Sequence, residues 1–135
     1  MKYGTMMLLM LFSILSNGEH YINLGVITQH YIQDNPNYNE DNQLIQYTHK
    51  GQIDLSIATF ENSRFYRSYA LGVGEHWMMA DIEIGYSVGV VTGYKENKMT
   101  QKVGFMLAPV FYAKKKMFKV MVMGNAINIG IEQRI

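Results

Sequence analysis

Two side chains with catalytic potential fall at the ends of predicted strands. His30 closes the first alternating segment of the chain, and Asn62-Ser63 occupy the turn between the third and fourth segments. A histidine can take a proton from a hydroxyl, and a serine can attack a carbonyl or hold it in place. If both positions lie at one rim of a sheet, the pair could act as base and nucleophile. The alternative is that both side chains make polar loop contacts with no catalytic role.

The elements that would position these residues are strands, because the chain alternates with a period of two from His20 onward. In the clearest segment, 82–90, the even-numbered residues are large and apolar and the odd-numbered ones are Glu, Gly and Ser. Alternation of this kind is typical of a strand with one apolar face. Similar segments cover 53–58, 68–74 and 126–132, and weaker ones lie near 20–32, 42–49, 103–112 and 117–123. The sequence therefore predicts an all-β chain of eight strands.

The composition of the second face indicates which kind of sheet this is. A soluble half-buried sheet carries solvated polar residues on that face, whereas these segments carry mostly Gly, Ala and Ser. Small residues suit the cramped interior of an eight-stranded barrel, with the aliphatic face turned outward to lipid. Membrane-spanning strands need about 9–11 residues, and eight of them fit after residue 18. We predict an eight-stranded antiparallel up-and-down transmembrane β-barrel over residues 19–135.

A few charged residues share the small-residue face or lie near it. Asp54, Glu83, Glu132 and Arg134 are expected to form an ion-pair network inside the barrel rather than a catalytic site. The lysines at 114–116 are expected in a solvated turn. The turn Gly124-Asn125 predicts a tight hairpin between the last two strands.

The N-terminal segment reads as a signal peptide. Lys2 precedes an apolar run of about ten residues that ends at Ser16-Asn17-Gly18, too short for a spanning helix and suited to secretion. We expect residues 1–18 to be removed, although a buried N-terminal helix is the alternative.

Composition narrows the classes of function. Of the 135 residues, 48% are apolar and 17% are charged, against about 25% charged in an ordinary soluble domain, which points to a membrane or a lipid. The net charge of +1 argues against nucleic acid as a partner. The absence of cysteine excludes disulfides and Cys-ligated metal. The four histidines lack ligand spacing, so no metal and no cofactor are predicted.

Four short motifs resemble, in order and nearly in spacing, the lipid A palmitoyltransferase (PagP) family. They are Ile27-Thr28-Gln29-His30, Tyr38-Asn39-Glu40, Phe60-Glu61-Asn62-Ser63 and Gly72-Val73-Gly74-Glu75. The resemblance implies an outer-membrane barrel that moves an acyl chain from a phospholipid to lipid A. It also implies that His30 and Ser63 are catalytic and that Gly74 forms the floor of an acyl pocket. Asn62 stands where the family has a catalytic aspartate.

Three hypotheses follow for the function. The first is an outer-membrane acyltransferase in which His30 acts as general base and Ser63 positions the ester carbonyl. The second is a catalytically inactive barrel that binds lipid or acts at the surface, since Asn62 cannot supply a carboxylate and most of the family's gate prolines are missing. In both, a monomer in the bacterial outer membrane would contact phospholipid and lipid A or lipopolysaccharide. The third is a soluble lipocalin-like binder, which would require the even-numbered face of 82–90 to point inward.

Overall fold

The computed structural model describes residues 6, 17–30, 41, 43–95 and 97–135. Most of the signal peptide predicted over residues 1–18, and the motif at 38–40, lie outside the described residues. Within the described part of the chain, no helix is long and apolar enough to cross a membrane.

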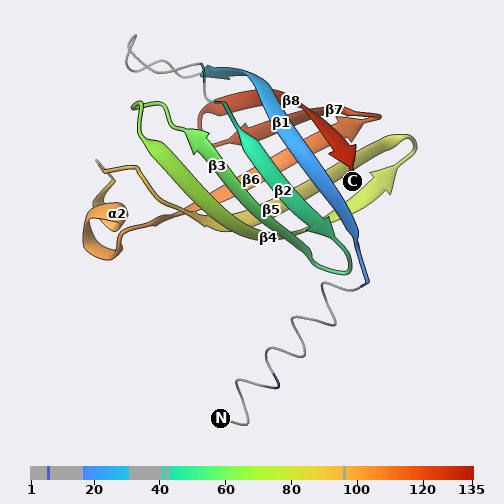
Figure 1. The fold of residues 1–135 in the computed structure, drawn as a ribbon, viewed down its shortest axis with the longest axis horizontal. Helices are drawn as coiled ribbons and strands as arrows, with labels where there is room; N and C mark the ends of the chain where they lie inside the picture. Colours follow the sequence, from blue (N-terminus) through green and yellow to red (C-terminus); the bar gives the residue numbers. More distant parts are fainter. Residues whose placement is uncertain (1–5, 7–16, 31–40, 42, 96) are drawn as a thin grey trace.

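Eight antiparallel strands close into a barrel in simple up-and-down order (Figure 1), which confirms the predicted all-β architecture of eight strands. The elements are β1 (Glu19–His30), β2 (Ile45–Lys50), β3 (Asp54–Glu61), β4 (Arg67–Met79), β5 (Ile82–Val91), α2 (Lys98–Val103), β6 (Met106–Lys115), β7 (Phe118–Met123) and β8 (Ala126–Arg134). The first and last strands close the barrel through a register that runs from Tyr21 opposite Arg134 to His30 opposite Ala126.

The two ends of the barrel differ in their connections. At the terminal end, where β1 begins and β8 stops, consecutive strands are joined by short turns at 51–53, 80–81 and 116–117. Ala80 and Lys116 adopt positive φ angles of 55° and 56° there, as tight hairpin turns require. The opposite end, here the loop end, carries the β3–β4 turn and the connection that contains α2 (Figure 1). The predicted hairpin at Gly124-Asn125 also lies at this end, and Gly124 has a φ of 58°.

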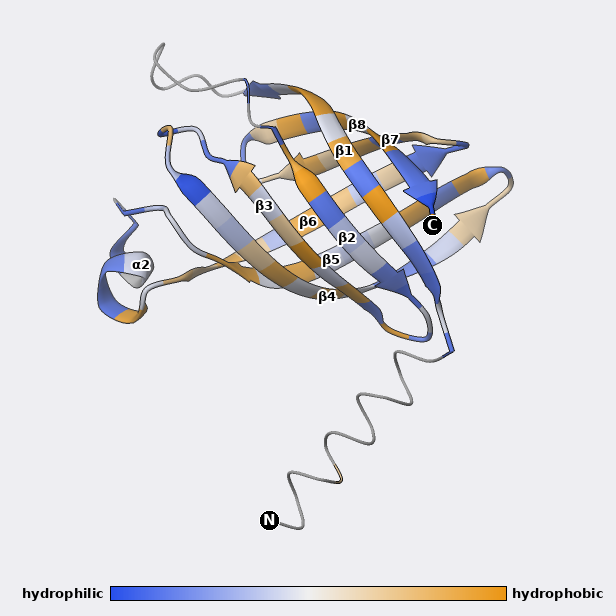
Figure 2. Ribbon diagram, viewed as in Figure 1, coloured by the Kyte–Doolittle hydropathy of each residue, from blue (hydrophilic) through white to orange (hydrophobic). Residues whose placement is uncertain are grey.

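The apolar side chains of the strands face outward. On β5, Ile82, Tyr86 and Val88 are exposed while Gly85 is buried, so the even-numbered face of this strand points away from the lumen. Exposed aliphatic and aromatic side chains occur on other strands too, among them Leu24, Ile57, Leu71, Leu107 and Phe111. Figure 2 shows the resulting alternation of hydrophobic and hydrophilic residues along the strands. The hydrophobic surface of this barrel is its outside.

The lumen is filled by side chains of two kinds. An apolar core, Leu44, Phe60, Val91, Ala108 and Met121, packs with partly buried neighbours such as Met106 and Met123 near the loop end. Toward the terminal end the buried side chains are charged, and they include Lys50, Asp54, Lys119 and Glu132. The lumen is therefore apolar in one half and ionic in the other.

Candidate functional site

The β3–β4 turn is organised by the side chain of Asn62, which is fully buried. Its Oδ1 accepts hydrogen bonds from the backbone N–H groups of Arg64 (2.9 Å) and Tyr66 (3.2 Å). Its Nδ2 donates to the Ser68 hydroxyl (2.9 Å) and to the Gly93 carbonyl (3.0 Å). An aspartate could accept the first two bonds but could not donate the last two. Asn62 therefore ties the turn to the chain that follows β5, a role for which an amide is required.

His30 and Ser63, the expected base and its partner, both lie at the loop end. His30 is the last residue of β1, opposite Ala126, and is buried. Ser63 follows Asn62 in the β3–β4 turn and is partly exposed. Of the two, Ser63 lines the cavity described next. Both residues therefore lie at the same end of the barrel, as the order of the strands predicted.

A cavity of about 340 Å³ opens at the loop end. Its walls are the β3–β4 turn, the segments that flank α2, and the turn that precedes β8. It is lined by Ser63, Arg64, Tyr66, Tyr94, Lys95, Asn97, Met106 and Asn125. The Lys95 Nζ lies 4.4 Å above the centre of the Tyr66 ring, a cation–π contact. Burial raises the pKa of Tyr94 to about 12, so this hydroxyl stays neutral and able to donate. The described lining has two cations and no carboxylate, which suits an anionic group.

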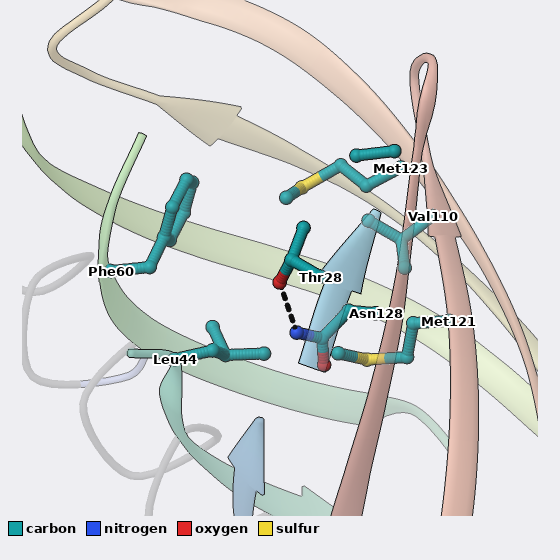
Figure 3. A pocket seen from close by; sticks show the side chains of 8 residues that line it. Thr28, Leu44, Phe60, Val110, Met121, Met123 and Asn128 are labelled. Atoms are coloured by element: carbon teal, nitrogen blue, oxygen red, sulfur yellow. Dashed lines mark hydrogen bonds between the residues drawn. The ribbon is translucent and has the colours of Figure 1, made fainter. Parts of the chain in front are cut away.

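A second, much smaller cavity lies in the apolar half of the lumen and encloses about 30 Å³. Figure 3 shows Phe60, Leu44, Met121 and Met123 around it, with Asn128 donating a hydrogen bond of 2.8 Å to Thr28 at its edge. This space suffices for about one water molecule. A long acyl chain would enter only if the flexible methionine side chains moved aside.

Gly74, the expected floor of an acyl pocket, lies on β4 between Asp54 of β3 and Ser87 of β5. A methyl carbon at this position would overlap the carbonyl oxygen of Tyr86 and touch the Ser87 backbone. Glycine is therefore needed for the close approach of β4 and β5. Ser87 in turn lines an interior cavity of about 20 Å³ that also borders Asp54 and Lys119.

The ionic half of the lumen centres on Glu132, whose side chain is inaccessible to solvent. Lys50 (2.7 Å), Lys119 (2.5 Å) and Lys114 (3.0 Å) all donate to its two oxygens. Lys50 also bonds to Glu83 across the lumen. The predicted ion-pair network is thus present around Glu132 and Glu83.

Other details of the network differ from the expectation. Asp54 pairs with His76 (2.7 Å). The side chain of Arg134 is 65% exposed and pairs with Glu19 at 2.6 Å, because β8 ends there and no neighbour covers it. Lys114, expected in a solvated turn, belongs to β6 and points inward, so that only Lys115 and Lys116 lie near the turn.

Sequence reasoning missed Lys50 and Lys119 as interior residues. Lys119 alternates with the exposed Phe118 and Val120 on β7. Its place on the inner face could therefore have been predicted from the period-two pattern. Lys50 ends β2, a strand whose alternation is weak, and its contacts come from residues far along the chain.

No protein-family model matches the chain, and no curated protein matches it. The arrangement of the residues described above therefore carries the functional argument.

Proposed function

We propose that the chain is a membrane-embedded barrel of the bacterial outer-membrane type that binds an anionic lipid headgroup at its loop end. The inverted distribution of polarity supports the membrane setting: large apolar side chains cover the outside while ionic side chains fill one half of the lumen. A barrel in lipid needs this arrangement. A soluble lipocalin-like barrel would need the reverse, and the outward even-numbered face of β5 argues against it.

The membrane setting can be tested with the single tryptophan of the chain. Trp77 lies on β4, is 46% exposed and packs edge-on against Tyr86 at 6.1 Å. In vesicles of brominated phosphatidylcholine, its fluorescence should be quenched relative to vesicles of the unbrominated lipid. A matched variant, Trp77→Phe with Met121→Trp, places the indole in the lumen and should be quenched less. Equal emission of wild type in both lipids would contradict the membrane setting.

The single observation that carries headgroup binding is the loop-end cavity whose lining includes the guanidinium of Arg64 and the ammonium of Lys95. Phospholipid and lipid A both present phosphate at the membrane surface, and guanidinium and ammonium groups bind phosphate. We expect native mass spectrometry of the micelle-released barrel to retain phosphatidylglycerol or lipid A. The double variant Arg64→Gln, Lys95→Gln should retain at least about tenfold less of either lipid. Lys102→Gln, an exposed charge on α2, is the control. Equal retention in all three proteins would count against this site.

Acyl transfer is the second candidate, favoured by the position of Ser63 in the wall of the same cavity. An acyl ester bound there would have its carbonyl near Ser63, and His30 at the same end of the barrel would serve as base toward the acceptor hydroxyl. The alternative, a catalytically inactive lipid-binding barrel, is favoured by Asn62, whose amide is engaged by its own turn, by Ser68 and by the Gly93 carbonyl.

Mass spectrometry of lipid A from cells that express the protein distinguishes the two. Transfer predicts an added acyl mass that disappears in Ser63→Ala and persists in Ser87→Ala, an interior serine outside the loop-end cavity. If wild type adds no mass while the cavity still retains lipid, the inactive barrel is the correct description.

A further inference from the structure

Glu75 places a carboxylate on the outer wall of the barrel. On β4 it alternates with the buried Gly74 and shares its face with the exposed Val73 and Trp77. Tyr86 of β5 lies directly opposite Glu75 in the antiparallel register, and directly opposed residues place their side chains on the same face. In the proposed membrane setting this carboxylate therefore faces lipid, where an ionisable side chain is costly unless it has a partner.

The position of Glu75 along β4 is close to the terminal end. β3 begins at Asp54, which lies opposite Gly74, so Glu75 is the first outward residue of β4 past the β3 ladder. Trp77 follows two residues later, about 7 Å further along the strand. Because tryptophan and tyrosine gather at the interface between membrane and water, Trp77 and Tyr86 place Glu75 near the level of the lipid headgroups.

Glu75 has no cationic partner among the described residues. The Tyr86 hydroxyl donates a hydrogen bond of 3.3 Å to its Oε2, and no described residue donates to Oε1. The other carboxylates at the terminal end each have a basic partner: Glu19 has Arg134, Asp54 has His76, Asp81 has Lys115, Glu83 has Lys50, and Glu132 has three lysines. Oε1 of Glu75 is thus open to a donor from outside the described chain.

Two aromatic rings accompany this carboxylate on the same face. The ring centroids of Trp77 and Tyr86 are 6.1 Å apart, the ring planes are inclined at 63°, and both side chains are exposed. The faces of indole and phenol rings attract organic cations, and a carboxylate oxygen accepts strong, charge-assisted hydrogen bonds from an ammonium group. The three side chains therefore have the chemistry that recognises a primary ammonium.

We propose that Glu75, Trp77 and Tyr86 bind the headgroup of phosphatidylethanolamine on the outer wall at the terminal end. The ammonium donates to Oε1 of Glu75 and lies against the rings, while the acyl chains follow the exposed apolar side chains of Val73 and Leu71 toward the middle of the membrane. The trimethylammonium of phosphatidylcholine has no N–H to donate. This inference rests on the proposed membrane setting but not on the loop-end cavity, which lies at the opposite end of the barrel.

The test is competition between phosphatidylethanolamine and phosphatidylcholine with identical acyl chains, in equal amounts, for the full chain in micelles. Both lipids carry the same phosphate, so the ratio retained in native mass spectrometry reports recognition of the ammonium. We expect wild type to favour phosphatidylethanolamine at least about tenfold, the contribution of a charge-assisted hydrogen bond. Glu75→Gln keeps the size of the side chain, removes its charge and should abolish the preference. Asp81→Asn, which removes an exposed carboxylate already paired with Lys115, is the matched control and should keep it.

Several outcomes would overturn the proposal. They are equal retention of the two lipids by wild type, an undiminished preference in Glu75→Gln, or an equal loss of preference in Asp81→Asn, which would reflect only the overall charge of this end. A dimer of wild type that disappears in Glu75→Gln, with no change in the lipid ratio, would assign the carboxylate to a second copy of the chain. Failure of the membrane setting itself is distinguishable, because it appears as equal emission of Trp77 in brominated and unbrominated lipid.

Discussion

Replacing Glu132 with glutamine should strongly destabilise the barrel. The substitution keeps the shape of the side chain but removes the charge that Lys50, Lys119 and Lys114 share at 2.7, 2.5 and 3.0 Å. Lys50 retains Glu83 as a partner, whereas Lys119, only 2% exposed, pairs with Glu132 among the described residues. Removing one member of a buried ion pair typically costs about 3–5 kcal/mol.

This cost is large against the stability of a typical small domain, about 5–15 kcal/mol. Because the groups concerned are almost inaccessible to solvent, screening by water does not reduce it. Adding Lys119→Met to Glu132→Gln removes the stranded ammonium, so we expect the double variant to recover part of the loss. A double-mutant cycle then gives the coupling energy of the pair.

The assay is urea-induced unfolding in phospholipid vesicles, followed by the fluorescence of Trp77. The matched control is Glu19→Gln, which breaks the exposed pair with Arg134 at 2.6 Å and should cost only about 0–1 kcal/mol. The reasoning fails if Glu132→Gln unfolds within about 1 kcal/mol of wild type, as an exposed pair would. It fails equally if Glu132→Gln and the control Glu19→Gln lower the free energy of unfolding by the same amount.

Three further predictions concern the turn and the strand contacts. Asn62→Asp loses the hydrogen bond that the amide donates to the Gly93 carbonyl and places a carboxylate against that oxygen, which should cost about 1–3 kcal/mol, read from urea midpoints; an unchanged midpoint would show that the turn does not depend on the amide. Gly74→Ala should lower the yield of folded barrel on a heat-modifiability gel, because the added methyl meets the Tyr86 carbonyl, whereas Gly51→Ala, whose added methyl would make only ordinary van der Waals contacts, should fold normally. Since burial raises the folded-state pKa of Tyr94 from 10 to about 12, its contribution to stability is complete below pH 10 and is lost as pH rises toward 12; Tyr94→Phe should remove that part of the alkaline pH dependence, and an identical profile in the two proteins would contradict it.

The fold was predictable because its signal is local. Alternation over 82–90 marks a strand and its two faces within nine consecutive positions, and Gly124-Asn125 marks a turn within two. The weaker segments were harder to delimit: β2 covers only Ile45–Lys50, and β4 extends to Met79, beyond the alternating stretch at 68–74.

The sites were less predictable because their contacts are remote in sequence. Lys50 and Glu132 are 82 positions apart, and Glu75 meets Tyr86 only through the register of β4 with β5. A search for short motifs therefore finds neither pair. Asn62 shows that a local motif can also mislead. Its place beside Ser63 suggested a lost catalytic carboxylate, whereas its four hydrogen bonds show a structural role for the amide in the turn.

The ionic half of the lumen also bears on how the barrel assembles. Glu132 lies on β8, the last strand to be synthesised, and its partners come from β2, β6 and β7. In the proposed membrane setting, until β8 pairs with β1, three lysines in an open sheet would face the membrane interior with one of their two carboxylates missing. Such a sheet is strongly disfavoured in lipid, so insertion and closure should occur as one cooperative step. A chain truncated before Glu132 would then stay at the membrane surface, where proteases can remove it.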